Sequence, residues 1–273
     1  MPNQSVKKTH GRSELKKFFL NGEIPSETHF EYLIDSTINK VDDGFTKDNN
    51  GFHVSPSGPE KTLITLYDHI DESTPFFHIS YDDQDEPSLQ FQPSRSSDDI
   101  RKNGNNGKPD DNSFYFHQGG RMGIGTKCAG QFGLQVKGYA GMEGRIGTYQ
   151  SGYVPANGKW QDMPGLNNLN NCNAYEIIAR TGWKGTGKFA VLHAIAICAY
   201  GPSGGKIRKT STCYGWAWNK LSLRWTGDKY DYRLQIRTRR NYGKYDGVHD
   251  IPIYYHVTKL WEDDQFLDKD VLH

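Results

Sequence analysis

The chain has 273 residues and a formal net charge of +1, a length for one large domain or roughly two to three small ones. So small a charge excludes a global field that would attract nucleic acid or an anionic membrane, and we expect neither partner. The 30 glycines, 16 tyrosines, 13 phenylalanines and 6 tryptophans favour short strands over a helical bundle.

The first residues, MPNQSVKKTHGRSELKK, lack the apolar core of a secretory signal peptide. The chain also has no apolar run of about 18 residues that would predict a membrane-spanning helix. We therefore expect synthesis in the cytoplasm without a signal peptide and without membrane insertion. An extracellular role would depend on lysis or another release route.

Residues 1–45 are predicted to form a helical docking or trimerisation segment. Ser13 is placed to cap a first helix, Gly22 to end it, and Ser26 or Thr28 to begin a second. The second helix carries one apolar stripe, consisting of Phe30, Leu33, Ile34 and Ile38. Helices this short do not bury a core alone, so the stripe is expected to pack on the rest of the chain or on other copies.

Residues 46–127 are predicted to form a thin, shaft-like β-rich region. The short runs TLITLY, PFFHISY, SLQFQ and SFYFHQ alternate with polar breaks. Such strands build a modest core, so intertwining with other chains is expected. GGRMGIGT at 119–126 marks a break, and the closely spaced glycines of the next stretch, FGLQVKGYAGMEGRIGTYQSG, suit tight turns or a close approach of backbones.

Residues 128–273 are predicted to form an antiparallel, jelly-roll-like β-sandwich. The strand candidates are NAYEIIART, GKFAVLHAIAICAYG, KLSLRW, YDYRLQIRTRR and IPIYYHVTKLW. GKFAVLHAIAICAYG is apolar on both faces, which is typical of a strand covered on both sides. In YDYRLQIRTRR the residues expected to face the core are Tyr230, Tyr232, Leu234, Ile236 and Thr238. The fold class is therefore mainly β with a short N-terminal helical hairpin.

Two segments match enzyme motifs by letter. GWKGTGKF at 182–189 resembles a phosphate-binding loop, but Phe189 stands where the Mg²⁺-binding hydroxyl belongs. GPSGG at 201–205 resembles a nucleophile elbow around Ser203, but strand-like residues follow instead of a helix. Both segments are predicted to be turns, and no catalytic residue is assigned.

No metal site or cofactor is predicted. The acidic run DDQDE at 82–86 lacks the glycine and the terminal glutamate of a calcium loop. Cys128, Cys172, Cys198 and Cys213 show no CxxC spacing and are expected to be structural or reduced. His193, inside an apolar run, is predicted to be a core histidine.

Two groups of residues are candidates for ligand binding. The first is an outward arginine row, made of Arg224, Arg233, Arg237 and Arg239, which is either an ordinary charged face or an anion-binding comb. The second comprises Tyr214, Trp216 and Trp218 of CYGWAW, which are predicted to share one strand face. These rings form either a buried aromatic layer or a rim that stacks on sugars.

The segment LKKFFLNGEIPSETHFEYLIDSTINKVDDGF resembles a segment of tail fibres and related appendage proteins of phages and phage-like contractile injection systems. The elements that carry the resemblance are Phe19, Gly22, Pro25, Thr28, Phe30, Leu33-Ile34-Asp35-Ser36 and Lys40. Met122-Gly123-Ile124-Gly125-Thr126 is similar to the M-G-I-G-T phrase of phage-fibre and adhesin-like chains. The stretch from GRIGTYQSGYVPANGKW to IYYHVTKLW is similar to a C-terminal domain attached to such N-termini.

The resemblance implies a structural or attachment protein without catalytic residues, a homotrimer that contacts other tail or baseplate proteins. It also implies a place in a virion or an extracellular phage-like particle. The chain is much shorter than a long fibre, which favours a compact particle component over a reaching, host-binding one. One alternative is a carbohydrate-binding, lectin-like adhesin that recognises a cell-surface glycan, and another is a hydrolase or NTPase.

Overall fold

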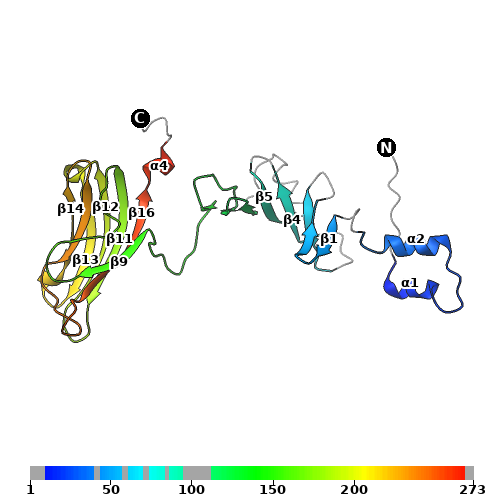
Figure 1. Ribbon diagram of the computed structural model, residues 1–273, viewed down its shortest axis with the longest axis horizontal. Helices are drawn as coiled ribbons and strands as arrows, with labels where there is room; N and C mark the ends of the chain where they lie inside the picture. The colour runs from blue at the N-terminus through cyan, green and yellow to red at the C-terminus, as the bar shows by residue number, and fades with distance from the viewer. Residues whose placement is uncertain are drawn as a thin grey trace. The chain divides into compact units, whose positions relative to one another are not determined.

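The computed structural model describes residues 10–39, 44–56, 61–69, 74–83, 86–94 and 112–267. The chain divides into two compact units, Met1–Ala140 and Gly141–His273. The prediction of a mainly β protein with two short N-terminal helices and C-terminal antiparallel sheets is confirmed (Figure 1).

The two helices are α1 (Arg12–Phe18) and α2 (Glu27–Asp35). The predicted cap at Ser13 is wrong, because the first helical bonds already run from Glu14 and Leu15 to the carbonyl oxygen of Gly11. Ser26 does cap α2, and its backbone N–H donates to Nδ1 of His29 at 3.2 Å.

Most of the first unit is β-structure. A hairpin joins β1 (Phe45–Asp48) and β2 (Gly51–Val54). A six-stranded sheet has the order β3-β4-β5-β6-β7-β8 and is antiparallel except between β7 and β8. Its strands are β3 (Thr62–Leu66), β4 (Phe77–Asp82), β5 (Ser88–Pro93), β6 (Phe114–His117), β7 (Arg121–Ile124) and β8 (Leu134–Val136). Residues 134–136 thus belong to this sheet and not, as predicted, to the C-terminal sandwich.

The second unit contains two antiparallel sheets. The larger has the order β13-β12-β11-β16-β9, and the smaller has the order β10-β15-β14. Their strands are β9 (Gln150–Pro155), β10 (Gln161–Asp162), β11 (Cys172–Gly182), β12 (Phe189–Ala199), β13 (Lys206–Tyr214), β14 (Leu221–Gly227), β15 (Tyr232–Thr238) and β16 (Pro252–Trp261). Side chains of both sheets, such as Ile177, Leu192 and Leu234, form one core, so the sheets are the two layers of a sandwich.

Burial along β15 follows the predicted alternation with one exception. Tyr232, Leu234, Ile236 and Thr238 are fully buried. Tyr230 is exposed, because it precedes the first residue of the strand.

The prediction that residues 189–199 are covered on both faces is wrong. Ala190, Leu192, Ala194 and further alternate residues of β12 are buried, whereas those of the other face are exposed, including Val191, Ile195 and Ile197. The smaller sheet covers only the inner face. His193 lies on this outer face and pairs with Glu176 at 2.9 Å, so it is not the predicted core histidine.

The sandwich has two ends. The chain enters at the start of β9, beside the last residues of β16. The opposite end, called the distal end, consists of the connections 156–160, 183–188, 215–220 and 239–251. Backbone bonds join these connections, for example from Tyr242 N to Ala156 O at 2.9 Å. None of the helices among the described residues is long and apolar enough to span a membrane.

Candidate functional site

The phosphate-loop match at 182–189 is a hairpin turn. Gly182 lies opposite Phe189 in the antiparallel pairing of β11 with β12. A strand follows the lysine, whereas a phosphate-binding loop needs a helix there to present its N-terminal amides. Lys188 donates from Nζ to the carbonyl oxygen of Asn241 at 3.0 Å. The predicted turn is confirmed.

The GPSGG match is also a turn. Ser203 lies in the short 3-10 helix η1 (Pro202–Gly204), and β13 follows directly. A nucleophile elbow requires a following α-helix to present the serine at a sharp turn. Across the described ranges, no group of three or more His, Cys, Asp or Glu side chains is placed to hold a metal ion.

The two tryptophans of CYGWAW lie on the surface of the distal end. Trp216 is 70 % exposed and Trp218 is 57 % exposed. The expectation that they continue a strand beyond Tyr214 is wrong, because β13 ends there and a 3-10 helix, η2 (Ala217–Asn219), follows. The buried aromatic layer is therefore not formed, and the rings are at a rim.

The connection between β13 and β14 is held by buried polar contacts. Asn219 is buried, and its Nδ2 donates to the carbonyl oxygen of Tyr214 at 3.0 Å. The hydroxyl of buried Tyr242 donates to the carbonyl oxygen of Asn219 at 2.5 Å. Gly215 has a φ of 86° and approaches Gly187 so closely that a Cβ would lie 2.7 Å from its carbonyl oxygen. The loop that carries the tryptophans is thus anchored rather than free.

Each exposed tryptophan of this loop lies against an arginine. The guanidinium carbon of Arg240 is 5.8 Å from the ring centre of Trp216. That of Arg239 is 5.7 Å from the ring centre of Trp218. Trp216, Trp218 and Arg240 line a small cavity of about 310 Å³. An amphipathic ring beside a guanidinium offers one surface for a sugar face and another for an acidic group.

A second aromatic–cation group lies on the outer face of the smaller sheet. The guanidinium carbons of Arg224 and Arg237 are 4.3 and 4.2 Å from the ring centre of Trp160. Such distances allow cation–π attraction. The ring of Trp160 therefore orients two arginines of the predicted row.

The remaining member of the row is paired with a carboxylate. Nη1 of Arg233 lies 3.4 Å from Oδ2 of Asp162, and Nε2 of Gln235 donates to the other oxygen at 2.7 Å. Gln235 also accepts from Nε of Arg224 at 2.8 Å. The four predicted arginines thus do not form one continuous row. Arg224, Arg233 and Arg237 share a face of the smaller sheet, whereas Arg239 lies beyond the end of β15, beside Trp218.

Positive charge accumulates beside Arg239. The pKa of Lys209 is lowered. Burial of its ammonium group is the largest cause, and the positive charges of Arg239 and Lys220 lower the pKa further. Cations that repel one another favour the binding of an anion between them. The distal end therefore combines exposed aromatic rings with a local excess of positive charge.

Trp216, Trp218 and Arg239 of these surfaces were predicted from the sequence, whereas Trp160 and Arg240 were not. Both lie in connections, where no periodic pattern indicates which face a side chain takes. Trp160 comes beside Arg237 only because the next residue, Gln161, pairs with Ile236 of β15.

A larger cavity lies at the opposite end of the sandwich. It measures about 570 Å³, and Cys172, Ile197, Trp261 and Leu267 are among its lining residues. Its acidic residue, Asp263, already accepts from the backbone N–H of Cys172 at 3.2 Å and from Nε1 of Trp261 at 2.5 Å. The lining of the cavity is therefore mostly apolar, and the carboxylate of Asp263 already accepts hydrogen bonds from the protein itself.

One of the predicted assembly residues, Phe30, takes part in the contact between the two helices: its ring centre lies 5.5 Å from that of Phe19, the residue that follows α1. Other side chains also make this contact: Phe18 stacks on His29 at 4.2 Å, and His10 lies 4.4 Å from Tyr32, between ring centres. The exposed fractions are 49 % for Phe30, 37 % for Leu33, 64 % for Ile34 and 67 % for Ile38. Ile38 lies three residues past Asp35, the last residue of α2, so it extends the apolar surface without being helical.

No model of a known protein family matches the chain, and no curated protein matches its sequence.

Proposed function

We propose that this chain is a non-enzymatic structural and attachment component of a phage tail or a phage-like contractile injection system. In this proposal it assembles as a homotrimer, contacts other tail or baseplate proteins, and presents its β-sandwich to a partner or a cell surface. The observation that carries the proposal is the exposure of Phe30, Leu33 and Ile34 on α2 and of Ile38 just beyond it.

The exposure favours assembly for an energetic reason. Two helices of 7 and 9 residues are too short to be stable through their own hydrogen bonds. Leu15 is their only buried apolar residue among the described positions. Burying one leucine or isoleucine side chain contributes about 1.5–3 kcal/mol, so covering the stripe would stabilise the pair substantially. The resemblance of this segment to phage appendage proteins is the reason for proposing a phage tail or a phage-like contractile injection system as the particle.

The test is native mass spectrometry of the full chain and of Leu33→Asp and Ile34→Asp. We expect an oligomer for the unaltered chain and a shift of both variants to monomers, while the circular dichroism of the sandwich is retained. The matched control is Thr28→Asp, which puts the same charge on an exposed position in the first turn of α2, where the helix dipole favours it. A monomeric unaltered chain at micromolar concentration would contradict the proposal.

The second candidate function is a carbohydrate-binding, lectin-like adhesin. The observation that favours it is the exposure of Trp216 and Trp218 beside Arg239 and Arg240 at the distal end. A glycan array that includes uronic acids and sialic acids distinguishes the two candidates. Glycan binding that Trp218→Ala weakens favours the adhesin, whereas a lack of binding to every sugar on the array favours the structural role alone.

A further inference from the structure

The six-stranded sheet of the first unit has one wholly uncharged face. Residues that lie directly opposite one another in neighbouring strands share a face, and the strand pairings therefore identify its members. They are Ile64, Leu66, Phe77, Ile79, Tyr81, Leu89, Phe91, Pro93, Phe114, Phe116, Met122, Ile124, Leu134 and Val136. We call this set the apolar face.

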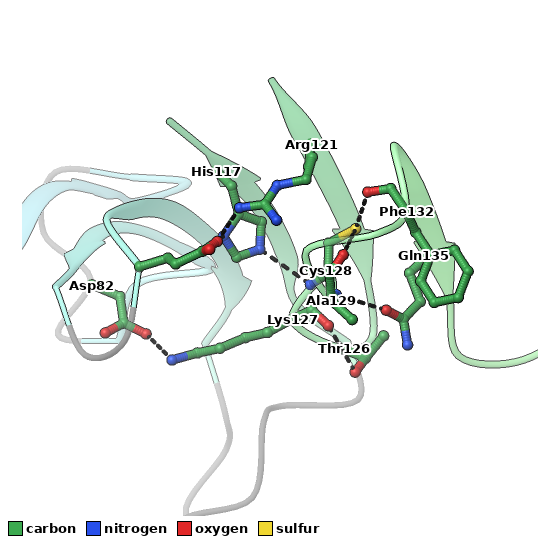
Figure 2. Close-up of polar contacts among 10 residues, drawn as sticks. Asp82, His117, Arg121, Thr126, Lys127, Cys128, Ala129, Phe132 and Gln135 are labelled. Atoms are coloured by element: carbon green, nitrogen blue, oxygen red, sulfur yellow. Dashed lines mark hydrogen bonds and ion pairs between the residues drawn. The ribbon is translucent and has the colours of Figure 1, made fainter. Parts of the chain in front are cut away.

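The opposite face of the same sheet is polar and is covered by the connection between β7 and β8. Nε2 of His117 accepts from the backbone N–H of Cys128 at 3.1 Å, and the thiol of Cys128 donates to the carbonyl oxygen of Phe132 at 2.9 Å (Figure 2). Lys127 pairs with Asp82 at 2.6 Å across the same region. The connection thus lies on the polar face and satisfies some of its hydrogen-bonding groups.

In the single chain the polar face of the sheet is therefore the more buried one, and the apolar face is the more exposed one. Tyr115 on the polar face is 1 % exposed, whereas its neighbour Phe116 on the apolar face is 42 % exposed. Leu134 at the β8 edge is 56 % exposed. An open apolar patch that crosses all six strands is unusual for a monomer and is typical of an interaction surface.

We infer that the apolar face packs against the same face of other copies of this chain. The inference rests on the proposed self-assembly and names the surface that the assembly buries. Two sheets stack at about 10 Å when their apolar side chains interdigitate. Here every facing position would meet an apolar or uncharged side chain.

Charge is the argument for a second copy as the occupant. None of the face positions is charged, so identical faces meet without like-charge repulsion or a buried unpaired ion. The outer face of the five-stranded sheet differs, because Glu176 and Arg180 alternate with its exposed isoleucines. Identical copies of that face would bring charges together, whereas the apolar face of the first unit is compatible with itself throughout.

The experiment compares Leu89→Glu and Phe116→Glu with Phe52→Glu in the full chain by native mass spectrometry and circular dichroism. Phe52 is an exposed phenylalanine of β2, outside this sheet, and controls for the added charge. We expect the two face variants to lose the oligomer at concentrations where the unaltered chain and Phe52→Glu retain it. An oligomer that persists in both face variants would overturn the inference.

A second measurement uses the unaltered chain, so that misfolding of a variant does not decide the result. Photochemical carbene labelling, read by mass spectrometry, is carried out above and below the assembly concentration. Labelling of Phe114 and Phe116 should fall at least severalfold on assembly, while labelling of Phe52 stays constant. Equal labelling of the face in both states contradicts the inference.

These outcomes separate the inference from the proposed function. A monomeric unaltered chain contradicts self-assembly itself. An oligomer with an unprotected apolar face leaves self-assembly intact and overturns only the assignment of this surface. Protection of the face in a monomer would mean that another part of the same chain covers it, and this also overturns the inference.

Discussion

Phe91 and Phe116 lie edge to face, with ring centres 5.1 Å apart and ring planes at 71°. The two residues come from neighbouring strands, β5 and β6, and share the apolar face of the six-stranded sheet. Such an aromatic pair contributes about 0.5–1.5 kcal/mol beyond the area it buries. The pair therefore orders the middle of a surface on which Leu89, Phe114 and Phe116 are exposed.

The two units of the chain expose different chemistry. The first unit exposes apolar side chains, on the helical pair and on the sheet face. The second unit places exposed tryptophans beside arginines at the distal end of its sandwich. Apolar surfaces favour permanent assembly, and aromatic–cationic rims favour contact with polar ligands. This division agrees with the proposed structural and attachment role.

Replacing Gly123 with alanine should destabilise the first unit. A Cβ at this position would lie 2.0 Å from the carbonyl oxygen of Thr126 and 3.0 Å from the backbone nitrogen of Cys128. The connection that covers the polar face would have to move, at a cost of about 1–3 kcal/mol for overpacking. Denaturant unfolding measures the loss. Gly133→Ala is the control, because nothing lies within 4 Å of its added methyl group, and an equal loss in both variants contradicts the argument.

The sequence predicted the features that depend on local periodicity. The alternation in residues 232–238 predicted the buried side of β15, where Leu234 and Ile236 are fully buried. The helical spacing of Phe30, Leu33 and Ile34 predicted one shared face. These predictions succeed because the period of side-chain direction is fixed by backbone geometry alone.

In β6 the sequence did not predict which face of the strand is covered. Phe114, Tyr115, Phe116 and His117 alternate as in an ordinary half-buried strand, yet the polar pair is covered and the phenylalanines are exposed. The outcome depends on the path of the connection 125–133, which no periodic pattern specifies. The same reason explains why Trp160 was missed.

Removing the exposed tryptophans should affect binding and leave folding unchanged. Trp216→Ala and Trp218→Ala remove side chains from the surface, where substitutions usually change stability by less than about 0.5 kcal/mol. Loss of one stacking ring, worth about 0.5–1.5 kcal/mol, should weaken binding of an acidic sugar roughly two- to tenfold. Calorimetric titration measures the affinity.

The control for this prediction is Tyr230→Ala. Tyr230 is also an exposed ring beside a cation, with Nζ of Lys229 lying 5.1 Å from its centre, but it lies at the other end of the sandwich. Its removal should leave the affinity unchanged. If all three variants weaken binding equally, the distal end is not the binding surface.

Asn173→Ala should destabilise the sandwich by a large amount, although it removes only one polar side chain. Asn173 donates from Nδ2 to the hydroxyl of Tyr232 and accepts at Oδ1 from the hydroxyl of Tyr175, both at 2.7 Å. Its loss leaves buried hydroxyls with fewer partners, at a cost of about 1–3 kcal/mol each. Chemical denaturation should show the loss, and Asn170→Ala at a nearby exposed position should not. An unchanged midpoint for Asn173→Ala contradicts this account.

The sandwich should lose stability in alkaline solution before its buried tyrosines ionise. Burial raises the pKa of Tyr232 to about 12, and burial likewise raises the pKa values of Tyr175, Tyr242 and Tyr255 above the ordinary value of 10.0. Above that value the unfolded chain releases phenolic protons that the folded chain retains. The folded state then binds more protons than the unfolded state, so the free energy of unfolding falls as pH rises. The contribution of Tyr232 is complete below pH 10 and is lost between pH 10 and about 12. Tyrosinate absorbance and far-ultraviolet circular dichroism, recorded together in an alkaline titration, measure it: the buried fraction of the absorbance change should coincide with unfolding. Complete ionisation near pH 10, with the sandwich still folded, would contradict the burial of these hydroxyls.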